Sequence, residues 1–247
     1  MEPFLFISYG LTKSGSTLAF QLTSVALEQA GFPQPRLTVP GLVVSHKINA
    51  IEHVDEVQAK QVRDELTRLG GPIVVKTHTR PDPALVAMVT QGRAKLHVVV
   101  RDPRDIALSM LDNGRRSRAR GKPAFSEFVT LADTFQGLDD QLRTLSQWAA
   151  LPEARVLQYD TLAFDTVTAA GDILAHLGIP GDPGRIAEEV LNHRFTQRNV
   201  ARRDRHRSEM PAADSAAFLT RYADFHARYL APAPTGASAG VASPLTQ

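Results

Sequence analysis

Short apolar runs alternate with longer stretches of helical periodicity along most of the chain. The apolar runs predict buried strands and lie at residues 4–7, 73–75, 96–100 and 156–157. In the other stretches apolar positions recur every three or four residues, as on helices that cover a sheet, over residues 17–30, 55–69, 82–91, 106–113, 125–150, 163–177, 183–192 and 212–229. This alternation predicts an α/β fold of three α/β/α layers around a central parallel sheet, with right-handed crossovers.

The remaining segments set the limits of the folded part. Residues 37–45 are either an additional strand or an irregular substrate loop. Residues 231–247 are rich in Pro, Ala, Gly and Ser and carry no charged side chain, so they cannot bury a core, and we expect a disordered tail. The 247 residues, 43% of them hydrophobic, suit a single domain over residues 1–230.

The loop after the first strand almost matches a phosphate-binding loop. In the pattern G-x-x-x-x-G-K-[ST], backbone N–H groups cradle phosphates, the Lys reaches them and the hydroxyl holds Mg²⁺. Gly10, Gly15 and Thr17 keep this spacing. Ser16 stands where the Lys should be, and the loop's only lysine is Lys13. A helix that begins near Thr17 would still direct N–H groups and its dipole at an anion; a Gly/Ser turn that only caps a helix is the alternative.

This loop resembles the 5′-phosphosulfate-binding loop of the sulfotransferase family, T-Y-P-K-S-G-T-T, whose second half residues 13–17 match as K-S-G-S-T. The resemblance implies a P-loop-like sulfotransferase fold and the donor 3′-phosphoadenosine 5′-phosphosulfate (PAPS), which is released as adenosine 3′,5′-bisphosphate (PAP). It also implies that Lys13 stabilises the negative charge that develops on the leaving phosphate. The residues that it assigns to the 5′-phosphosulfate are Ser14, Gly15, Ser16 and Thr17, with Lys13.

A dense charge cluster follows the strand at residues 96–100. Residues 101–109 resemble the family's 3′-phosphate motif, R-D-P-R-D-x-x-x-S. The resemblance implies that the planar fork of Arg101 and the hydroxyl of Ser109 bind that phosphate. A P-loop kinase would usually place an Asp at this strand end to hold Mg²⁺, so Arg101 favours an anion over a metal. The alternative is an ion-pair network of the cluster's own charges, Arg101, Asp102, Arg104 and Asp105.

The strand at residues 73–75 runs into Lys76, Thr77 and His78, at the end where open α/β sheets bind their ligands. The family's K-T-H segment looks like this. The resemblance implies His78 as the general base on the acceptor and Lys76 beside the transferred group. An imidazole with a pKa of about 6.5 can accept a proton near neutral pH. The alternative is a histidine that only belongs to a loop or the core.

Two weaker similarities lie further along the chain. Residues 156–162 resemble the family's segment ending Y-E-D-L, which implies that Tyr159 contacts the adenine; a tyrosine at the edge of a core strand is the alternative. The family's segment R-K-G-x-x-G-x-W-K would fall at residues 198–206, where both glycines and the Trp are missing. Arg198 matches the arginine of the motif, which implies a contact with the 3′-phosphate. The resemblance does not define how this segment closes as a lid over the nucleotide.

Composition excludes several classes of function. The chain has no cysteine, which rules out disulfides, Cys-ligated zinc and a thiol nucleophile and suits the cytoplasm. No run is long enough to span a bilayer, and the first strand begins too early for a signal peptide. The net charge is only +2, but cations cluster at residues 115–122 and 194–207. These are either solvated, mobile loops or surfaces that attract a nucleotide or an acidic acceptor. Residues 115–122 contain no aromatic residue and residues 194–207 contain only Phe195, whereas a nucleic-acid site interleaves several stacking aromatics with its cations.

The sequence therefore predicts a cytoplasmic, metal-independent sulfotransferase that moves the sulfuryl group of PAPS to a hydroxyl or amine of a small-molecule, glycan or lipid acceptor. Peripheral membrane contact is compatible with the basic clusters, and either a monomer or a homodimer fits. The alternatives are a P-loop-type nucleotide kinase or hydrolase and a non-catalytic nucleotide- or anion-binding module. Convergence of Lys13, Lys76 and His78 would favour the enzyme, whereas a His78 that points into the core would favour the binding module.

Overall fold

A parallel sheet lies at the centre of the molecule. The computed structural model describes residues 2–197 and 200–231, and within them four parallel strands form a sheet in the order β2-β1-β3-β4. Every residue of the two strands β1 and β2 is buried, which is why these strands read as unbroken apolar runs rather than as alternating ones. The strands are β1 (Leu5–Gly10), β2 (Ile73–Thr77), β3 (Ala94–Val100) and β4 (Arg155–Gln158).

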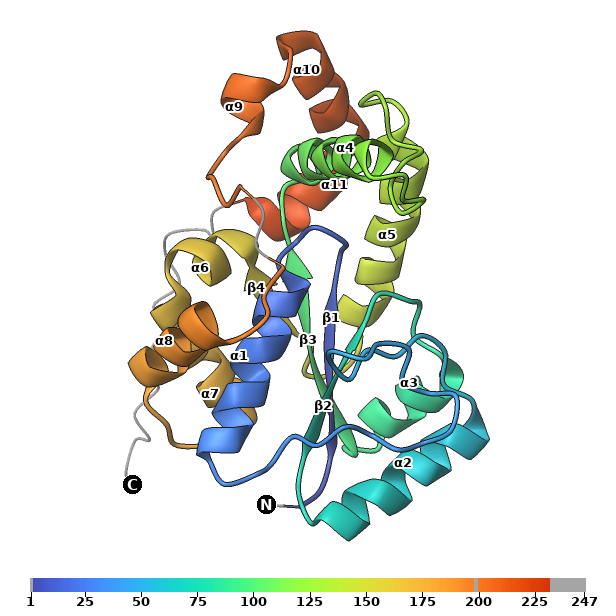
Figure 1. Ribbon diagram of the computed structural model, residues 1–247, viewed down its shortest axis with the longest axis vertical. Coiled ribbons are helices and arrows are strands. Elements are labelled where there is room, and N and C mark those ends of the chain that lie inside the picture. Colours follow the sequence, from blue (N-terminus) through green and yellow to red (C-terminus); the bar gives the residue numbers. More distant parts are fainter. Residues whose placement is uncertain (1, 198–199, 232–247) are drawn as a thin grey trace, which may run out of the picture.

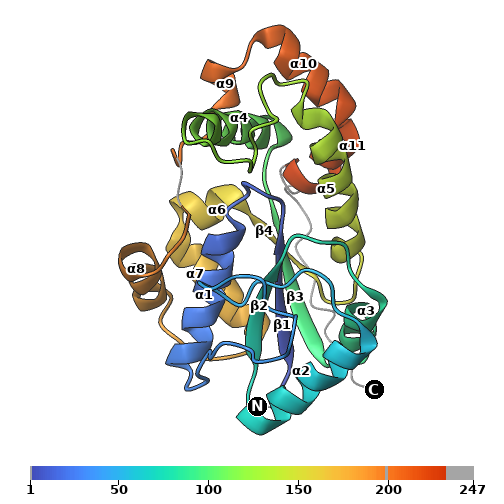
Figure 2. The same cartoon turned by 45° about the vertical axis from the view of Figure 1, so that its right-hand side comes forward.

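Helices cover both faces of this sheet, which confirms the predicted three layers (Figures 1 and 2). Phe6 packs with α1, α7 and α8 on one face, and its neighbour Ile7 packs with α2, α3 and α5 on the other. The helices are α1 (Ser16–Gln29), α2 (Glu56–Leu69), α3 (Pro83–Thr90), α4 (Pro103–Ala119), α5 (Thr134–Ala149), α6 (Tyr159–Phe164), α7 (Thr166–Leu177), α8 (Pro183–His193), α9 (His206–Glu209), α10 (Ala212–Arg221), α11 (Ala223–Phe225) and the π-helical turn η1 (His226–Leu230).

The predicted helix at residues 125–150 is wrong in its first part, because α5 begins only at Thr134. The preceding segment folds back along α4. The Arg118 guanidinium donates to the carbonyl oxygens of Ser126 and Phe128 at 2.8 Å each, and Phe125 has φ +64°, a backbone conformation outside the α-helical region. The basic residues 115–119 belong to α4 rather than to a loop.

Two other predicted helices are divided in the structure, and the segment with two alternatives proves to be irregular. The helix predicted at residues 163–177 is divided at Asp165, whose carboxylate caps α7 by accepting the N–H of Thr168. The one predicted at residues 212–229 is divided into α10, α11 and η1. Residues 37–45 are irregular, with one isolated bridge from Val43 to Ile51.

Some predictions fall on parts of the chain that the structure does not describe. Arg198 and nearly all of the predicted tail, residues 232–247, lie outside the described residues. Within the described ranges, no helix combines the length and the apolar character needed to cross a membrane.

A buried histidine in the sheet makes stability depend on pH. The ring of His97 on β3 lies 2.7 Å from Ser8 Oγ on β1, and burial holds the pKa of His97 well below its usual range. Because the unfolded chain binds a proton there at a higher pH than the folded one, stability is lost as pH falls below about 6.5. We expect the Ser8→Ala/His97→Leu double variant to lose roughly 2 kcal/mol less stability between about pH 6.5 and 4.5 than the parent, measured by urea unfolding. Identical losses would contradict this role of His97.

Candidate active site

The loop between β1 and α1 is shaped by local contacts. The hydroxyl and the N–H of Ser14 both donate to the carbonyl of Leu11, at 2.7 and 3.2 Å. Gly15 has φ +84°, a left-handed conformation that favours glycine. A Cβ on Gly10 would lie 2.7 Å from Cβ of Ser16, so this position also needs a glycine. Ser14 therefore shapes the loop, and both glycines are required by the backbone.

The loop leads directly into the amino end of α1. Gly15 is the N-cap and has no side chain to cap the helix, and the first turn holds no acidic residue. Ser16 and Thr17 are buried in that turn. The amide groups at such an uncapped end, together with the helix dipole, form an environment that attracts anions. This is where the structure places the predicted phosphosulfate-binding residues.

Arg101 connects β3 to this loop. Its Nη1 donates to the carbonyl of Lys13 at 2.8 Å, and its guanidinium carbon lies 3.9 Å from the centre of the Tyr159 ring. The Tyr159 ring in turn lies against Gly15, where a Cβ would come within 3.1 Å of the ring. Arg101 is only 7% exposed, and its Nε has no partner among the described residues. Arg101, Tyr159 and the loop thus form one packed unit with one unsatisfied donor.

The charge cluster after β3 divides into two roles. Asp102 caps α4 and pairs with Arg104 at 2.6 Å, as expected of a structural ion pair. Asp105 lies 3.9 Å from Arg101, and one of its oxygens accepts from both the N–H and Nδ1 of His206 at 2.9 Å. Ser109, the other predicted phosphate ligand, is buried on the same helix. The ion-pair interpretation therefore holds for Asp102 and Arg104, whereas Arg101 faces the loop.

Lys76 and His78 form a hydrogen-bonded pair at the carboxyl end of β2. The Lys76 Nζ lies 2.6 Å from His78 Nε2, and His78 Nδ1 lies 2.6 Å from the Gly10 carbonyl oxygen. A carbonyl only accepts, so the Nδ1 carries the proton and Nε2 presents a lone pair. Residue His78 is solvent-accessible, and its ring is held against Lys76 and Gly10 rather than in the core.

The pKa values of this pair respond to their surroundings. Protein packed around the ring and the nearby ammonium of Lys76 hold the pKa of His78 well below its usual range. Burial lowers the pKa of Lys76 to about 8, and the charge of Lys13 adds to that shift. At neutral pH the pair is therefore a neutral imidazole beside a cationic lysine.

Lys13 is the third cation of the site. Burial and the charge of Arg116 lower the pKa of Lys13 to about 8, and its Nζ lies 4.7 Å from the centre of the Phe125 ring. The charge of Lys13 also lowers the pKa of both Lys76 and His78. The contacts that the structure shows are those of Lys76 with His78 and of His78 with Gly10, the first residue of the loop that contains Lys13.

Several residues that support the loop carry no sequence signal. Gln141 on α5 accepts from both the N–H and the hydroxyl of Thr12, at 2.8 and 2.7 Å. Trp148 on the same helix donates to the carbonyl of Thr79 at 2.9 Å and so holds the chain just after His78. Both residues lie inside a predicted helix, where nothing in the local pattern distinguishes them.

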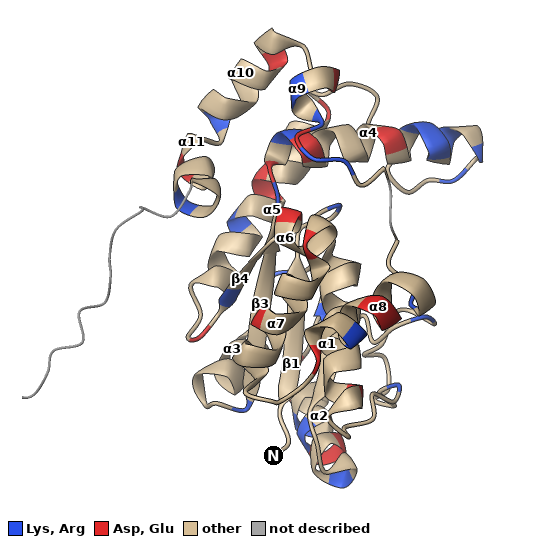
Figure 3. Cartoon of the chain, turned by 90° about the vertical axis from the view of Figure 1, so that its left-hand side faces the viewer, with Lys and Arg blue, Asp and Glu red and all other residues tan. Residues whose placement is uncertain are grey.

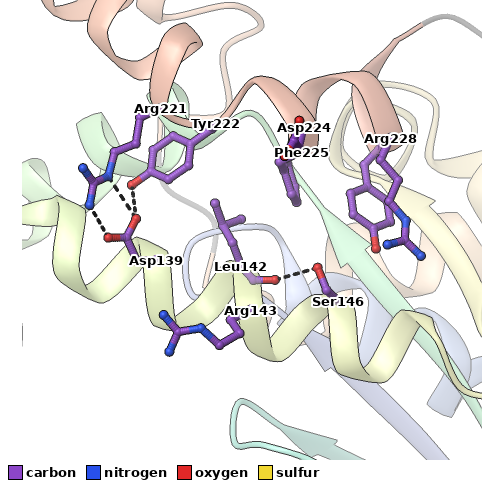
Figure 4. A pocket seen from close by; sticks show the side chains of 10 residues that line it. Asp139, Leu142, Arg143, Ser146, Arg221, Tyr222, Asp224, Phe225 and Arg228 are labelled. Carbon is purple, nitrogen blue, oxygen red and sulfur yellow. Dashed lines mark hydrogen bonds and ion pairs between the residues drawn. The ribbon is translucent and has the colours of Figure 1, made fainter.

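Two cavities lie beside these elements. One, of about 980 Å³, is lined by Arg101 and Tyr159 together with residues of the C-terminal segment, among them Arg228 and Tyr229. The other, of about 390 Å³, lies between α5 and the C-terminal helices (Figure 4). There the carboxylate of Asp139 accepts from Arg221 and from the hydroxyl of Tyr222. None of the predicted site residues lines the second cavity.

Comparison with known proteins gives a consistent result. The model of the sulfotransferase domain family matches residues 5–221. Mouse sulfotransferase SULT7A1, crystallised with PAP, is 17% identical with a TM-score of 0.56 over 92% of this chain and 86% of that one. Retinol dehydratase in a complex with retinol and PAP is 14% identical with a TM-score of 0.60 over 95% of this chain and 84% of that one. At such identities the two structures show a shared fold. No curated protein sequence matches the chain.

The contact between Gly15 and Tyr159 can be tested against a matched glycine. Gly15 and Gly31 have φ of +84° and +88°, but a Cβ on Gly31 would meet no atom within 4 Å. We expect Gly31→Ala to cost ~1–2 kcal/mol for the left-handed backbone, and Gly15→Ala to cost ~1–3 kcal/mol more because the ring of Tyr159 must move. Denaturant unfolding measures the loss of stability in both variants. Equal losses would show that the Tyr159 ring moves aside at no cost in stability.

Proposed function

Since this chain belongs to the sulfotransferase domain family, we propose that it transfers the sulfuryl group of PAPS to a hydroxyl or amine of an acceptor. The observation that carries the proposal is the hydrogen bond from His78 Nδ1 to the carbonyl of Gly10. This bond joins a candidate base to the loop that would hold the donor. It orients the base toward the place where the transferred group would lie.

The donor would bind along the loop and the start of α4. N–H groups of Gly15, Ser16 and Thr17 and the cation of Lys13 suit the 5′-phosphosulfate. Arg101 suits the 3′-phosphate, since its buried Nε has no partner among the described residues and a phosphate oxygen would accept from it. We assign Ser109 and Arg198 to the same phosphate, and Tyr159 to the adenine, as parts of this proposal.

The proton of the acceptor hydroxyl would pass to Nε2 of His78. That lone pair is now occupied by Lys76, so Lys76 has to move away from the ring before the base can act. An ammonium that leaves the ring is free to bind the transferred group. As the acceptor oxygen bonds to sulfur, the bond from sulfur to the 5′-phosphate oxygen breaks, and Lys13 stabilises the charge on the leaving phosphate.

Metal independence and the setting of the reaction are part of the same proposal. A sulfuryl group carries less charge than a phosphoryl group, so Lys13 and Lys76 suffice to stabilise its transfer, and Arg101 stands where a kinase would usually place a metal-binding Asp. A chain without cysteine suits the reducing cytoplasm. Retinol dehydratase has been crystallised with androsterone and with retinol, and a small-molecule acceptor is therefore the starting point for assays, with glycans and lipids next.

The proposal predicts tight binding of PAP in the presence of a metal chelator, measured by calorimetry. His78→Ala should lower sulfuryl transfer, followed as PAP release, by about 10²–10⁴-fold because the general base is lost. Its affinity for PAP should stay at the parent value, which is the control for folding. Preference for ATP with Mg²⁺ over PAP would point to a kinase instead, and full turnover by His78→Ala would remove His78 from the chemistry.

The lysine pKa values predict the pH dependence of the reaction. Lys13 and Lys76 have pKa values lowered to about 8, so both lose their charge as pH rises through that value. His78 has a lowered pKa and stays unprotonated throughout the neutral range. We expect kcat/KM to be flat near neutral pH and to fall above about pH 8. An acid limb centred near pH 6.5 would indicate an unperturbed histidine.

A further inference from the structure

The C-terminal part of α4 and the residues just after it form a basic ridge, defined here as residues 115–122. It carries five cations and no carboxylate, on a chain whose net charge is only +2. Helix α4 lies across the carboxyl end of the sheet, and its basic end projects beyond the strands (Figure 3). The cations are Arg115, Arg116, Arg118, Arg120 and Lys122.

Three of these cations are available to a ligand. Arg118 is engaged by the carbonyls of the following segment, and Arg116 donates to Asn113 Oδ1 at 3.1 Å. The side chains of Arg115, Arg120 and Lys122 are exposed and make no hydrogen bond or ion pair with any residue that the structure describes. The acidic residue one turn before the ridge, Asp112, is paired with Arg205 at 2.9 Å, and residues 115–122 themselves contain no carboxylate.

The ridge is packed against residues 125–128, and Phe125 of that segment contacts the side chain of Lys13. A Cβ on Gly114 would lie 2.5 Å from the carbonyl oxygen of Phe125, so helix and segment are in close contact. Phe125 has φ +64°, a rare conformation for an aromatic residue, and its ring lies under the Lys13 ammonium. Arg116 is near enough to lower the pKa of Lys13. The near end of the ridge, at Arg116, therefore borders Lys13.

The 3′-phosphate of the donor does not account for the outer cations of the ridge. Arg101 lies two residues before α4 and Arg120 directly after it, which places their backbones about 28 Å apart at 1.5 Å per residue. The ridge is thus remote from the group that we assign to the 3′-phosphate. On the near side it adjoins Lys13, across which the acceptor has to approach.

We propose that the basic ridge binds an anionic group of the acceptor, so that the molecule sulfated carries a carboxylate, sulfate or phosphate of its own near the reacting hydroxyl. The inference rests on the proposed sulfuryl transfer and names its substrate class. Fixed cations attract such a substrate and hold it beside a neutral base. Arg116 offsets the charge of the bound anion on the side of the reaction.

The test uses acceptor pairs that differ only in charge. One pair is a phenol with a carboxylate and its primary amide; the other is an oligosaccharide with a uronic acid at every second sugar and the same chain with its carboxylates amidated. Equilibrium binding to the PAP-loaded protein and PAP release are both measured at low and high salt. We expect the acids to bind and react about tenfold better than the amides, an advantage that salt removes by screening.

Two double variants locate the effect. Arg115→Gln/Arg120→Gln should lower affinity and kcat/KM for the acids by about three- to tenfold, as expected for two exposed charge pairs, and leave the amides unchanged. The control is Arg93→Gln/Arg185→Gln, which removes two exposed arginines outside the ridge and should change neither. The acceptor pair whose acid loses more affinity in Arg115→Gln/Arg120→Gln identifies whether the anion belongs to a small molecule or to an oligosaccharide.

Two results would overturn the inference. Equal binding of acid and amide would show that the ridge does not distinguish a charged acceptor from a neutral one. Weaker PAP binding by Arg115→Gln/Arg120→Gln would show that the ridge binds the donor instead. Failure of the proposed function would look different, because the parent protein would then not bind PAP in the presence of a chelator.

Discussion

The carbonyl of Gly10 is the point on which the site depends, because it fixes the ring of His78. Parallel pairing of Ser8 with Lys76 and of Tyr9 with Thr77 brings the next residues, Gly10 and His78, to the same level at the carboxyl edge of the sheet. The acceptor lone pair of that carbonyl then selects the tautomer with the proton on Nδ1. A shift of one residue in the register would turn His78 to the other face and lose this bond.

The register depends in turn on the core. Phe6 and Ile7 are fully buried on opposite faces of β1, and neither can be exposed without the loss of about 1.5–3 kcal/mol of burial free energy. Packing of the two helical layers thus determines the position of His78 through the register of the strands. Gln141 and Trp148 extend this support, since one helix holds both the loop at Thr12 and the chain at Thr79.

The sequence predicted the elements whose local pattern matches their final environment. Unbroken apolar runs indicated the buried strands, and residues 13–17 and 76–78 identified the two parts of the site that the structure brings together. It failed where a distant partner decides the conformation. The helix predicted through Phe125 does not form. The segment packs instead against α4, where Arg118 binds the carbonyls of Ser126 and Phe128. Gln141 was missed because its partner Thr12 lies 129 positions away in the sequence.

The hydrogen bond from Arg101 to the carbonyl of Lys13 makes two events interdependent. The same guanidinium holds the left-handed backbone at Lys13, with φ +66°, and is the group assigned to an incoming phosphate. A ligand that draws Arg101 away relaxes the peptide that positions the Lys13 ammonium, and by thermodynamic reciprocity any group that fixes Lys13 changes the affinity of Arg101 for its anion. Binding at one end of the nucleotide would then change the affinity at the other end through a single peptide unit, without movement of a domain.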